Sequence, residues 1–235
     1  MFDDILDYSP ATIDRDDVVK KIYKHYEDSN NDRFSNRIGG SIIGSKCDRK
    51  IFYSFRWVNK PKFCGRKLRL FDTGHLEEQR VINDFNNIGV SIDSSQEVFN
   101  GGFTHLVGRV DGIIDNHAIL EIKTMSKKWY NELLKKGLKV GFYHYYAQCQ
   151  YYMELSGYHR CLFIAKNKDT DDLRCLEVVY DSRLAKGLID KALHITEMKF
   201  PPVKTKDFKE CLMCDFKKIC KEGGDPEKNC RSCKY

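Results

Sequence analysis

A strand–turn–strand pattern over residues 106–123 constrains the fold of this chain more than any other segment. Two apolar runs flank the polar triplet Asp115-Asn116-His117, which is typical of a tight turn between antiparallel strands. If the strands pair symmetrically about this turn, Asp111 lies directly opposite Glu121, with Cβ atoms about 5 Å apart on one face of the sheet. Lys123, two residues beyond Glu121, points to the same face. The segment therefore predicts a hairpin with charged side chains gathered on one face.

The predicted pair of carboxylates requires a cation nearby, because two negative charges this close repel each other. A divalent hard ion meets this need, and Mg²⁺ binds through only one or two carboxylates where a substrate phosphate and water complete its coordination shell. A neighbouring lysine can orient or deprotonate the attacking water. The other interpretation is a solvent-facing hairpin with ordinary charged residues, since such residues alternate in any half-exposed strand. The strand over residues 118–123 is otherwise apolar, which favours a functional site at its end.

The rest of the chain alternates between helical and strand patterns. Helical spacing and end signals predict helices over residues 14–26, 72–87, 127–136, 143–155 and 182–199. Apolar or alternating runs predict strands over residues 90–99, 106–114, 118–123, 161–165 and 173–180. The second helix is expected to start at Asp72-Thr73-Gly74, which places His75 in its first turn. This order predicts an α/β core over residues 37–200, with an acidic helical lead-in over residues 1–36 and a cysteine-rich tail over residues 201–235.

Composition and charge exclude several classes of protein. With 41% hydrophobic and 31% charged residues the chain is neither disordered nor membrane-spanning, and no apolar run approaches the roughly 18 residues of a membrane helix. The first residues carry neither a secretory signal nor a lipidation motif, so a cytoplasmic protein is expected. The net charge of +6 is compatible with a polyanionic partner but does not by itself indicate one.

Cysteines are concentrated at the end of the chain, where five of the ten lie within residues 211–235. In a reducing compartment, clustered thiols hold metal more often than they form disulfides. A thiol redox enzyme is disfavoured, because the C-x₂-C pair here lacks the βαβ context of such motifs. The spacing C-x₂-C-x₁₅-C-x₂-C matches a structural Zn²⁺ site on Cys211, Cys214, Cys230 and Cys233. Buried structural thiols are expected at the isolated positions Cys64, Cys149, Cys161 and Cys175.

Three motifs in succession resemble those of the PD-(D/E)xK nuclease superfamily, and in particular its RecB-like exonuclease branch. They are Gly108-x-x-Asp111, Glu121-Ile122-Lys123 and Gln148-x-x-x-Tyr152. The segments 68–75 and 148–153 look like phage-encoded members of that branch, and the resemblance spans about residues 41–233. It implies a restriction-endonuclease-like core, in which a mixed sheet is flanked by helices, with a C-terminal cysteine-rich metal clamp.

The resemblance also implies roles for individual residues. Asp111, Glu121, the carbonyl group of Ile122 and His75 would bind Mg²⁺ or Mn²⁺, and Lys123 would be the catalytic lysine. Gln148 and Tyr152 lie one helical turn apart and would face the site together, where they would hold Lys123 or the DNA end.

The cysteines admit a second arrangement in this family. The segment around Cys47 resembles the first cysteine segment of the iron-sulfur nucleases of CRISPR adaptation. By this resemblance Cys47, Cys211, Cys214 and Cys220 would hold a [4Fe-4S] cluster and connect the start of the core to its end. The zinc arrangement remains the alternative, because spacing alone favours it.

The expected function is that of a divalent-metal-dependent deoxyribonuclease. By resemblance it would act as an exonuclease, on single-stranded DNA ends, in phage DNA replication or recombination, with phage or host proteins of those processes as possible partners. Lysines with interspersed aromatics, a combination suited to single strands, occur at Lys127, Lys128, Trp129, Tyr130, Lys135, Lys136 and Lys139. The alternative is a non-catalytic nucleic-acid-binding protein that keeps the fold and the clamp. Asp111, Glu121 and Lys123 are all present, which disfavours a decayed site.

Overall fold

The computed structural model describes residues 15–30, 35–60, 62–93, 96–212 and 214–232. The first residue of the helix predicted over residues 14–26, two residues of the strand predicted over residues 90–99, and Cys233 lie outside the described residues. Contacts divide the chain into two units, residues 1–32 with 62–73 and residues 33–61 with 74–235. The predicted division into lead-in, core and tail stays a prediction.

The smaller unit is formed by helix α1 (Arg15–Asp28) and the first part of helix α4 (Gly65–Asn87). Glu27 accepts a hydrogen bond of 2.7 Å from the backbone N–H of Gly65. A Cβ at Gly65 would lie 2.1 Å from the carbonyl oxygen of Tyr23, so only glycine permits this close approach. Near the end of α1, Tyr26 donates a hydrogen bond to Asp72 of α4.

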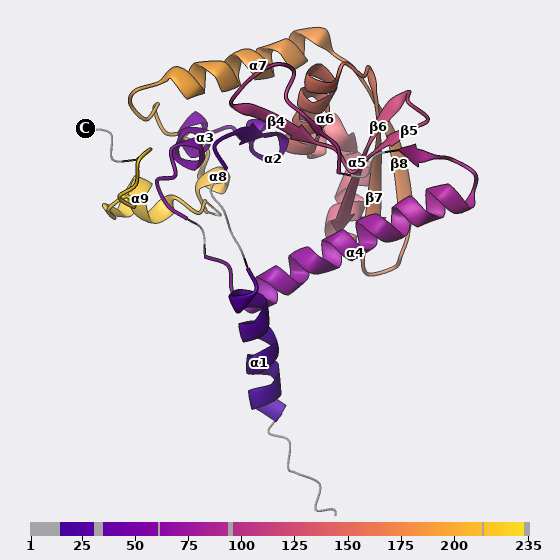
Figure 1. The fold of residues 1–235 in the computed structure, drawn as a ribbon, viewed down its shortest axis with the longest axis horizontal. Coiled ribbons are helices and arrows are strands. Elements are labelled where there is room, and N and C mark those ends of the chain that lie inside the picture. Colours follow the sequence, from indigo (N-terminus) through magenta and orange to yellow (C-terminus); the bar gives the residue numbers. More distant parts are fainter. Residues whose placement is uncertain (1–14, 31–34, 61, 94–95, 213, 233–235) are drawn as a thin grey trace, which may run out of the picture. The chain divides into compact units, whose positions relative to one another are not determined.

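The larger unit contains two sheets (Figure 1). The five-stranded sheet has the order β2 (Ile92–Asp93), β5 (Gly112–Ile114), β6 (Ala118–Met125), β7 (Arg160–Asn167) and β8 (Leu173–Val179). Its central pair, β6 and β7, is parallel, and its other pairs are antiparallel. The three-stranded sheet has the order β1 (Ile38–Gly39), β4 (Leu106–Arg109) and β3 (Val98–Phe99). The mixed α/β architecture expected from the sequence is therefore confirmed.

Helices cover both faces of the five-stranded sheet (Figure 1). Val81 and Ile82 of α4 pack on the face formed by alternate strand residues, Ile114, Leu120, Ile122 and Ile164. The other face, which includes Ile119 and Phe163, belongs to the main core with helices α5 (Lys127–Gly141), α6 (Tyr143–Ser156) and α7 (Ser182–Glu197). The short helices are α2 (Gly40–Ile43), α3 (Asp48–Phe55), α8 (Phe208–Leu212) and α9 (Lys217–Glu222).

Several predicted elements and their end signals are confirmed. Gly137 interrupts α5 with a φ of 66°, and Gly157 ends α6 in the left-handed conformation with a φ of 80°. The strands β7 and β8 form the predicted second hairpin, and α7 ends before Pro201. Most importantly, β5 pairs with β6 in the predicted register, with Gly112 opposite Leu120 and Ile114 opposite Ala118.

The predicted start of the helix at Asp72 is wrong. Helix α4 begins at Gly65, so His75 lies in the helix interior and not in a first turn. The presumed capping groups have other partners, because the hydroxyl of Thr73 donates back to the carbonyl of Arg69 within the helix. The carboxylate of Asp72 accepts the hydroxyl of Tyr26.

The continuous strand predicted over residues 106–114 is also wrong. It is divided at Val110 and Asp111 into β4 and β5, which belong to different sheets. The two backbone N–H groups at the division have different partners, since Val110 donates to the carbonyl of Glu97 and Asp111 to that of Leu120. The run over residues 90–99 is likewise divided, into β2 and β3.

The isolated cysteines follow the prediction only in part. Cys149 and Cys161 are buried as expected, whereas Cys64 and Cys175 are exposed. Cys175 lies on the edge strand β8, in the row of alternate residues, Leu173, Cys175, Glu177 and Val179, that are all exposed. No helix among the described residues combines the length and the apolar character needed to cross a membrane.

Candidate active site

Asp111 lies at the division between β4 and β5, where the chain passes from one sheet to the other. Its carboxylate oxygen Oδ2 accepts a hydrogen bond of 2.7 Å from the backbone N–H of Ile122 on β6. The side chain is buried, and the backbone N–H of Asp111 donates to the carbonyl of Leu120, the residue before Glu121. The strand pairing therefore holds one carboxylate against the backbone of the strand that carries the other.

Glu121 is the most deeply buried acidic group of the site, with 1% of its surface exposed. Its Oε1 accepts a hydrogen bond of 2.7 Å from Gln148 Nε2 and forms an ion pair with the ammonium group of Lys123. Its Oε2 is buried without a hydrogen-bond partner among the described residues. A buried carboxylate oxygen without a donor costs free energy, so this position favours a cation.

Lys123 stands beside the buried carboxylate on β6. Its ammonium group also donates a hydrogen bond of 3.2 Å to the carbonyl oxygen of Ile122, one of the predicted metal ligands. The ring of Tyr145 lies on another side, with its centroid 5.9 Å from Lys123 Nζ. The ammonium group of Lys123 thus balances the charge of Glu121 and donates a hydrogen bond to the neighbouring carbonyl group of Ile122.

Gln148 and Tyr152 meet on one side of α6, as their spacing of four residues predicts. Gln148 Nε2 donates to the hydroxyl oxygen of Tyr152 at 2.9 Å as well as to Glu121. The Tyr152 ring fits into a slot between two glycines. A Cβ at Gly40 or Gly108 would lie 2.2 Å or 2.9 Å from the ring.

The ionisation of the site follows from burial and mutual charge. Burial raises the pKa of Glu121 to about 7, which Lys123 opposes and Asp111 reinforces. Burial also raises the pKa of Asp111, against the opposite effects of Lys123, the Ile122 N–H and His75. Burial alone would lower the pKa of Lys123, but Glu121 and Asp111 outweigh it and raise the pKa. The site thus holds a protonated lysine between carboxyl groups that ionise reluctantly.

Helix α4 contributes two further groups. His75 is exposed, and its imidazole lies close enough to lower the pKa of Asp111 slightly against the effect of burial. Glu78, one turn further along α4, was not predicted as a site residue. Burial and the nearby Asp111 raise its pKa, whereas Lys123 and His75 lower it. A spacing of three residues from His75 was the available signal, because it places both side chains on one face of the helix.

The residues of this acidic site suit a divalent cation by their chemistry. Three carboxyl groups and a backbone carbonyl are the oxygen ligands that Mg²⁺ and Mn²⁺ prefer, and the buried Oε2 of Glu121 lacks a donor. In the part of the chain that the structure describes, no three side chains of His, Cys, Asp or Glu are already arranged as a metal-binding group. The ion pair between Lys123 and Glu121 gives a reason, since the ammonium group occupies an acidic oxygen.

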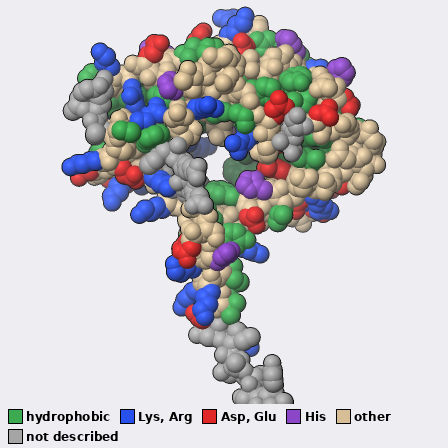
Figure 2. All heavy atoms as spheres, in the orientation of Figure 1, with side chains coloured by type: hydrophobic (Ala, Val, Ile, Leu, Met, Phe, Trp, Pro, Cys, Tyr) green, Lys and Arg blue, Asp and Glu red, His purple; other side chains and the backbone are tan. Residues whose placement is uncertain are grey.

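A second group of predicted residues surrounds a small cavity at the other end of the larger unit. Cys47, at the start of α3, lines it together with Cys211, Cys214 and Cys220 from the tail. Arg49 donates a hydrogen bond to the sulfur of Cys220 at 3.9 Å. Further basic residues lining the cavity are Lys50, Lys204, Lys217 and Lys221. Figure 2 shows Lys and Arg side chains on the part of this surface near α3 and α9.

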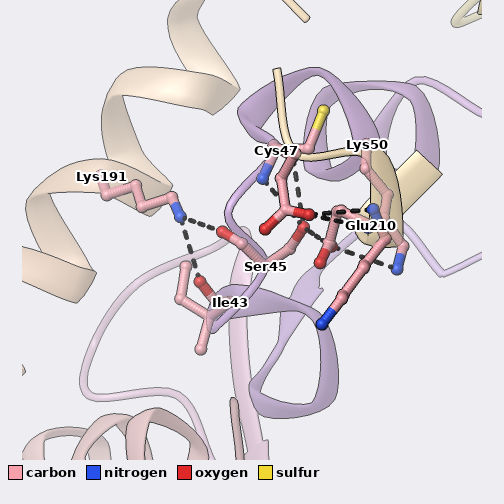
Figure 3. A network of polar contacts seen from close by, with 8 residues as sticks. Ile43, Ser45, Cys47, Lys50, Lys191 and Glu210 are labelled. Atoms are coloured by element: carbon pink, nitrogen blue, oxygen red, sulfur yellow. Dashed lines mark hydrogen bonds and ion pairs between the residues drawn. The ribbon is translucent and has the colours of Figure 1, made fainter. Parts of the chain in front are cut away.

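Polar contacts beside this cavity connect the Cys47 segment to the tail and to α7 (Figure 3). Ser45 donates a hydrogen bond of 2.5 Å to Glu210, the residue before Cys211, and accepts one from the backbone N–H of Cys47. Lys191 of α7 donates to the carbonyl groups of Ile43 and Ser45. These contacts hold the segment that carries Cys47 against α8 and α7.

Cys230 does not line this cavity and is exposed. Its segment attaches to the end of α3 instead. The backbone N–H of Glu227 donates to the carbonyl of Val58, and Asn229 donates to the carbonyl of Trp57. Arg231 lies over the ring of Phe55 at 4.1 Å. Because Cys233 is not among the described residues, the zinc arrangement stays a prediction.

The lysine-rich helix α5 differs from its prediction in one aromatic residue. Trp129 is 52% exposed, but Tyr130 is buried in the main core and cannot stack on a base. Lys128 lies over the ring of Trp129 at 5.5 Å, and Lys139 lies over the ring of Tyr146 at 5.3 Å. Lys136 pairs with Glu132 on the same helix.

Solved structures with a similar fold include two of an alkaline exonuclease, LHK-Exo, from Laribacter hongkongensis. One has a TM-score of 0.52 at 15% identity and covers 74% of this chain and 90% of that chain. The other, in complex with dAMP, has a TM-score of 0.55 at 14% identity and covers 75% and 90%. The protein SSO0001 has a TM-score of 0.55 at 19% identity and covers 87% and 96%. At these identities the similarity concerns the fold.

The comparison of whole sequences with curated proteins gave no significant match. A family profile, however, matches residues 46–221, which is well over half of the chain and includes every site residue described above from Cys47 to Cys220. The profile describes a family of nucleases, and its match agrees with the three motifs and with the mixed sheet that carries them. The chain therefore belongs to the PD-(D/E)XK nuclease superfamily.

Proposed function

We propose that this protein is a divalent-metal-dependent deoxyribonuclease that hydrolyses phosphodiester bonds at DNA ends. The observation that carries the proposal is the buried Glu121, which has one oxygen without a hydrogen-bond donor among the described residues and pairs with Lys123. The carboxylate of Asp111 accepts a hydrogen bond from the N–H of Ile122, the next residue along the strand. Nucleases of this superfamily generally use divalent metal ions such as Mg²⁺. A carboxylate pair beside a lysine suits this chemistry better than it suits a passive structural role.

Each residue of the site has a definable part in this proposal. Asp111, Glu121, the carbonyl group of Ile122 and His75 would hold Mg²⁺ or Mn²⁺, and Glu78 adds a further carboxylate close by. When bound, the ion supplies positive charge for the scissile phosphate and makes water a better nucleophile.

The ion pair between Lys123 and Glu121 would break, and the ammonium group of Lys123 would turn toward the attacking water or the phosphate. Gln148 would keep the orientation of Glu121 fixed through the hydrogen bond to Oε1, and Tyr152 would hold Gln148 in place.

Exonucleolytic action on single strands is the finer part of the proposal. Support comes from the fold that the chain shares with an alkaline exonuclease and from the exposed Trp129 among the lysines of α5. An exposed indole can stack on an unpaired base while lysines contact phosphates. We place this activity in phage DNA replication or recombination, in the cytoplasm of a host cell.

The decisive experiment uses anaerobically purified protein, Mg²⁺ or Mn²⁺, and end-labelled linear DNA beside covalently closed single-stranded circles. We expect degradation of linear strands, resistance of circles, and loss of activity by orders of magnitude in Asp111→Asn. Asp115→Asn in the turn of the same hairpin is the matched control, since its left-handed conformation suits asparagine. A wild-type protein that binds DNA with these metals but never cleaves it would favour the non-catalytic alternative.

We propose further that Cys47, Cys211, Cys214 and Cys220 hold a [4Fe-4S] cluster. These four cysteines line one cavity, whereas Cys230 is exposed and attached elsewhere. The basic residues around the cavity suit the negative charge of four thiolates on iron, and the Arg49 contact to Cys220 is a hydrogen bond of the kind that tunes such clusters.

Iron content and visible absorption distinguish the cluster from zinc. An anaerobic preparation should be brown, and its colour should bleach on reduction. Cys47→Ser should lose iron, whereas Cys230→Ser should retain it. A colourless protein with one Zn²⁺ that is lost in Cys230→Ser would establish the zinc alternative instead.

A further inference from the structure

A network of charged side chains around one buried lysine lies on the α4 side of the sheet, outside the site described above. Lys166 of β7 is only 3% exposed, and its ammonium group forms ion pairs with Glu77 of α4 and, at 2.8 Å, with Asp171 in the turn before β8. Arg80 of α4 lies 3.0 Å from the Asp171 carboxylate and 3.8 Å from that of Glu77. Three charged side chains, Glu77, Arg80 and Asp171, therefore surround one buried lysine.

The position of Lys166 follows from the alternation of β7. Leu162 and Ile164 point to the face that α4 covers, and Lys166 continues this row toward the end of the strand. An ammonium group on this face has lost most of its hydration and needs carboxylate partners at contact distance. Glu77 therefore has to approach Lys166 closely. The rotation of α4 about its axis and its position along that axis must both allow this contact.

The same rotation decides where the next residue points. Glu78 follows Glu77 directly and lies three residues after His75 on the same helix face, and Asp111 is close enough to raise the pKa of its carboxyl group. One turn further on, Val81 and Ile82 pack against the sheet. An ionic contact and an apolar contact, a turn apart, thus fix both the axial position and the rotation of the helix.

We propose that Lys166 and Glu77 are positioning residues for the metal site. Their ion pair sets α4 so that the carboxylate of Glu78 reaches the space beside Asp111 and Glu121, and the affinity of the site for divalent cations depends on it. This inference rests on the proposed function, because it takes the acidic centre to be a cation site.

The test measures Mn²⁺ binding to the full-length protein by calorimetry, in Glu77→Gln, Glu78→Gln and the double variant. We expect each single substitution to weaken binding by about 10-fold, the lower end of what the loss of a group supporting metal ligands costs. The double variant should bind no more weakly than Glu78→Gln, since Glu77 acts only through Glu78. Unchanged affinity in Glu77→Gln, or losses that multiply in the double variant, would overturn the proposal.

Two further variants keep the test independent of folding. If Glu77→Gln does not fold, Glu77→Leu combined with Lys166→Met replaces the buried pair by apolar groups, a change that proteins often tolerate. This variant should also bind Mn²⁺ about 10-fold more weakly, and wild-type affinity would count against the proposal. Glu177→Gln is the matched control, because it removes the exposed pair with Arg160 on the same sheet and should leave Mn²⁺ binding unchanged.

Asp111→Asn separates failure of this inference from failure of the proposed function. If Asp111→Asn binds Mn²⁺ as tightly as the wild type, the acidic centre is not the cation site and the proposed function fails. If Asp111→Asn loses binding while Glu77→Gln keeps it, the centre stands and only the positioning role is wrong.

Discussion

Gln148 donates one hydrogen bond to Glu121 and a second to the hydroxyl oxygen of Tyr152, at 2.7 Å and 2.9 Å. A single side-chain amide therefore connects helix α6 to the acidic end of β6. Because both bonds are buried, the amide has one orientation that satisfies its neighbours. The arrangement leaves one oxygen of Glu121 without a donor and fixes the direction in which it points.

Replacing Gln148 by leucine should reduce nuclease activity by about 10- to 100-fold, because Glu121 loses the group that orients it. It should also lower the free energy of unfolding by about 1–3 kcal/mol, since buried polar partners are left unpaired. Steady-state cleavage and urea denaturation measure the two effects.

Gln150→Leu is the matched control for this substitution. Gln150 is buried on the same helix but bonds to the carbonyl of Val179 and the N–H of Asp181, away from the acidic centre. It should lose similar stability and keep its activity. Equal losses of activity in both variants would argue against a specific role for Gln148.

Gly108→Ala should damage the site without removing any functional group. The new Cβ would lie 2.9 Å from the Tyr152 ring, which would have to shift and take Gln148 with it. We expect a loss of stability of about 1–3 kcal/mol from overpacking and a lower rate of cleavage. In Gly187→Ala on α7 the Cβ meets nothing within 4 Å, so this control should gain about 0.5–1 kcal/mol.

Glu121→Gln should change how the stability of the metal-free protein depends on pH. The pKa of Glu121 is raised from 4.5 to about 7 in the folded protein, so between these values the folded chain holds a proton that the unfolded chain has released. The tighter binding of this proton stabilises the folded protein. This stabilisation is fully present below pH 4.5 and is lost as the pH rises through about 7.

Urea denaturation in the presence of a metal chelator, at pH 4.5, 6 and 8, measures this effect. The first two pH values lie within the range between the ordinary pKa of Glu121, 4.5, and its raised pKa of about 7, and the third lies above it. The stability of Glu121→Gln relative to the wild type should improve as the pH rises across that range. A difference between Glu121→Gln and wild type that stays constant with pH would mean that Glu121 ionises normally.

Trp129→Ala should weaken the binding of single-stranded DNA by about 1–3 kcal/mol, the usual contribution of one stacked base. Leu134→Ala on the same helix is the control, because the two side chains are 52% and 51% exposed. Fluorescence anisotropy with a labelled oligonucleotide, in Ca²⁺ to suppress cleavage, measures both. Equal affinities of the two variants for single-stranded DNA would show that Trp129 of α5 does not contact the DNA.

The sequence alone determined the local geometry of the site. The length of the turn at residues 115–117 fixed the register of β5 on β6, and the two-residue period of a strand placed Glu121 and Lys123 on one face. The helical period similarly placed Gln148 beside Tyr152. These relationships are short in sequence and depend on backbone geometry, so a pattern of residue types is enough to predict them.

The tertiary structure decided everything that depends on competition between distant segments. The run over residues 106–114 is divided because Val110 and Asp111 find different partners, at Glu97 and Leu120. Glu78 joins the acidic centre because α4 packs on the sheet through Val81 and Ile82, a contact that the helical pattern of α4 does not reveal. A residue's neighbours in the chain do not determine which distant segment pairs with it, and packing against that segment overrides the local signals.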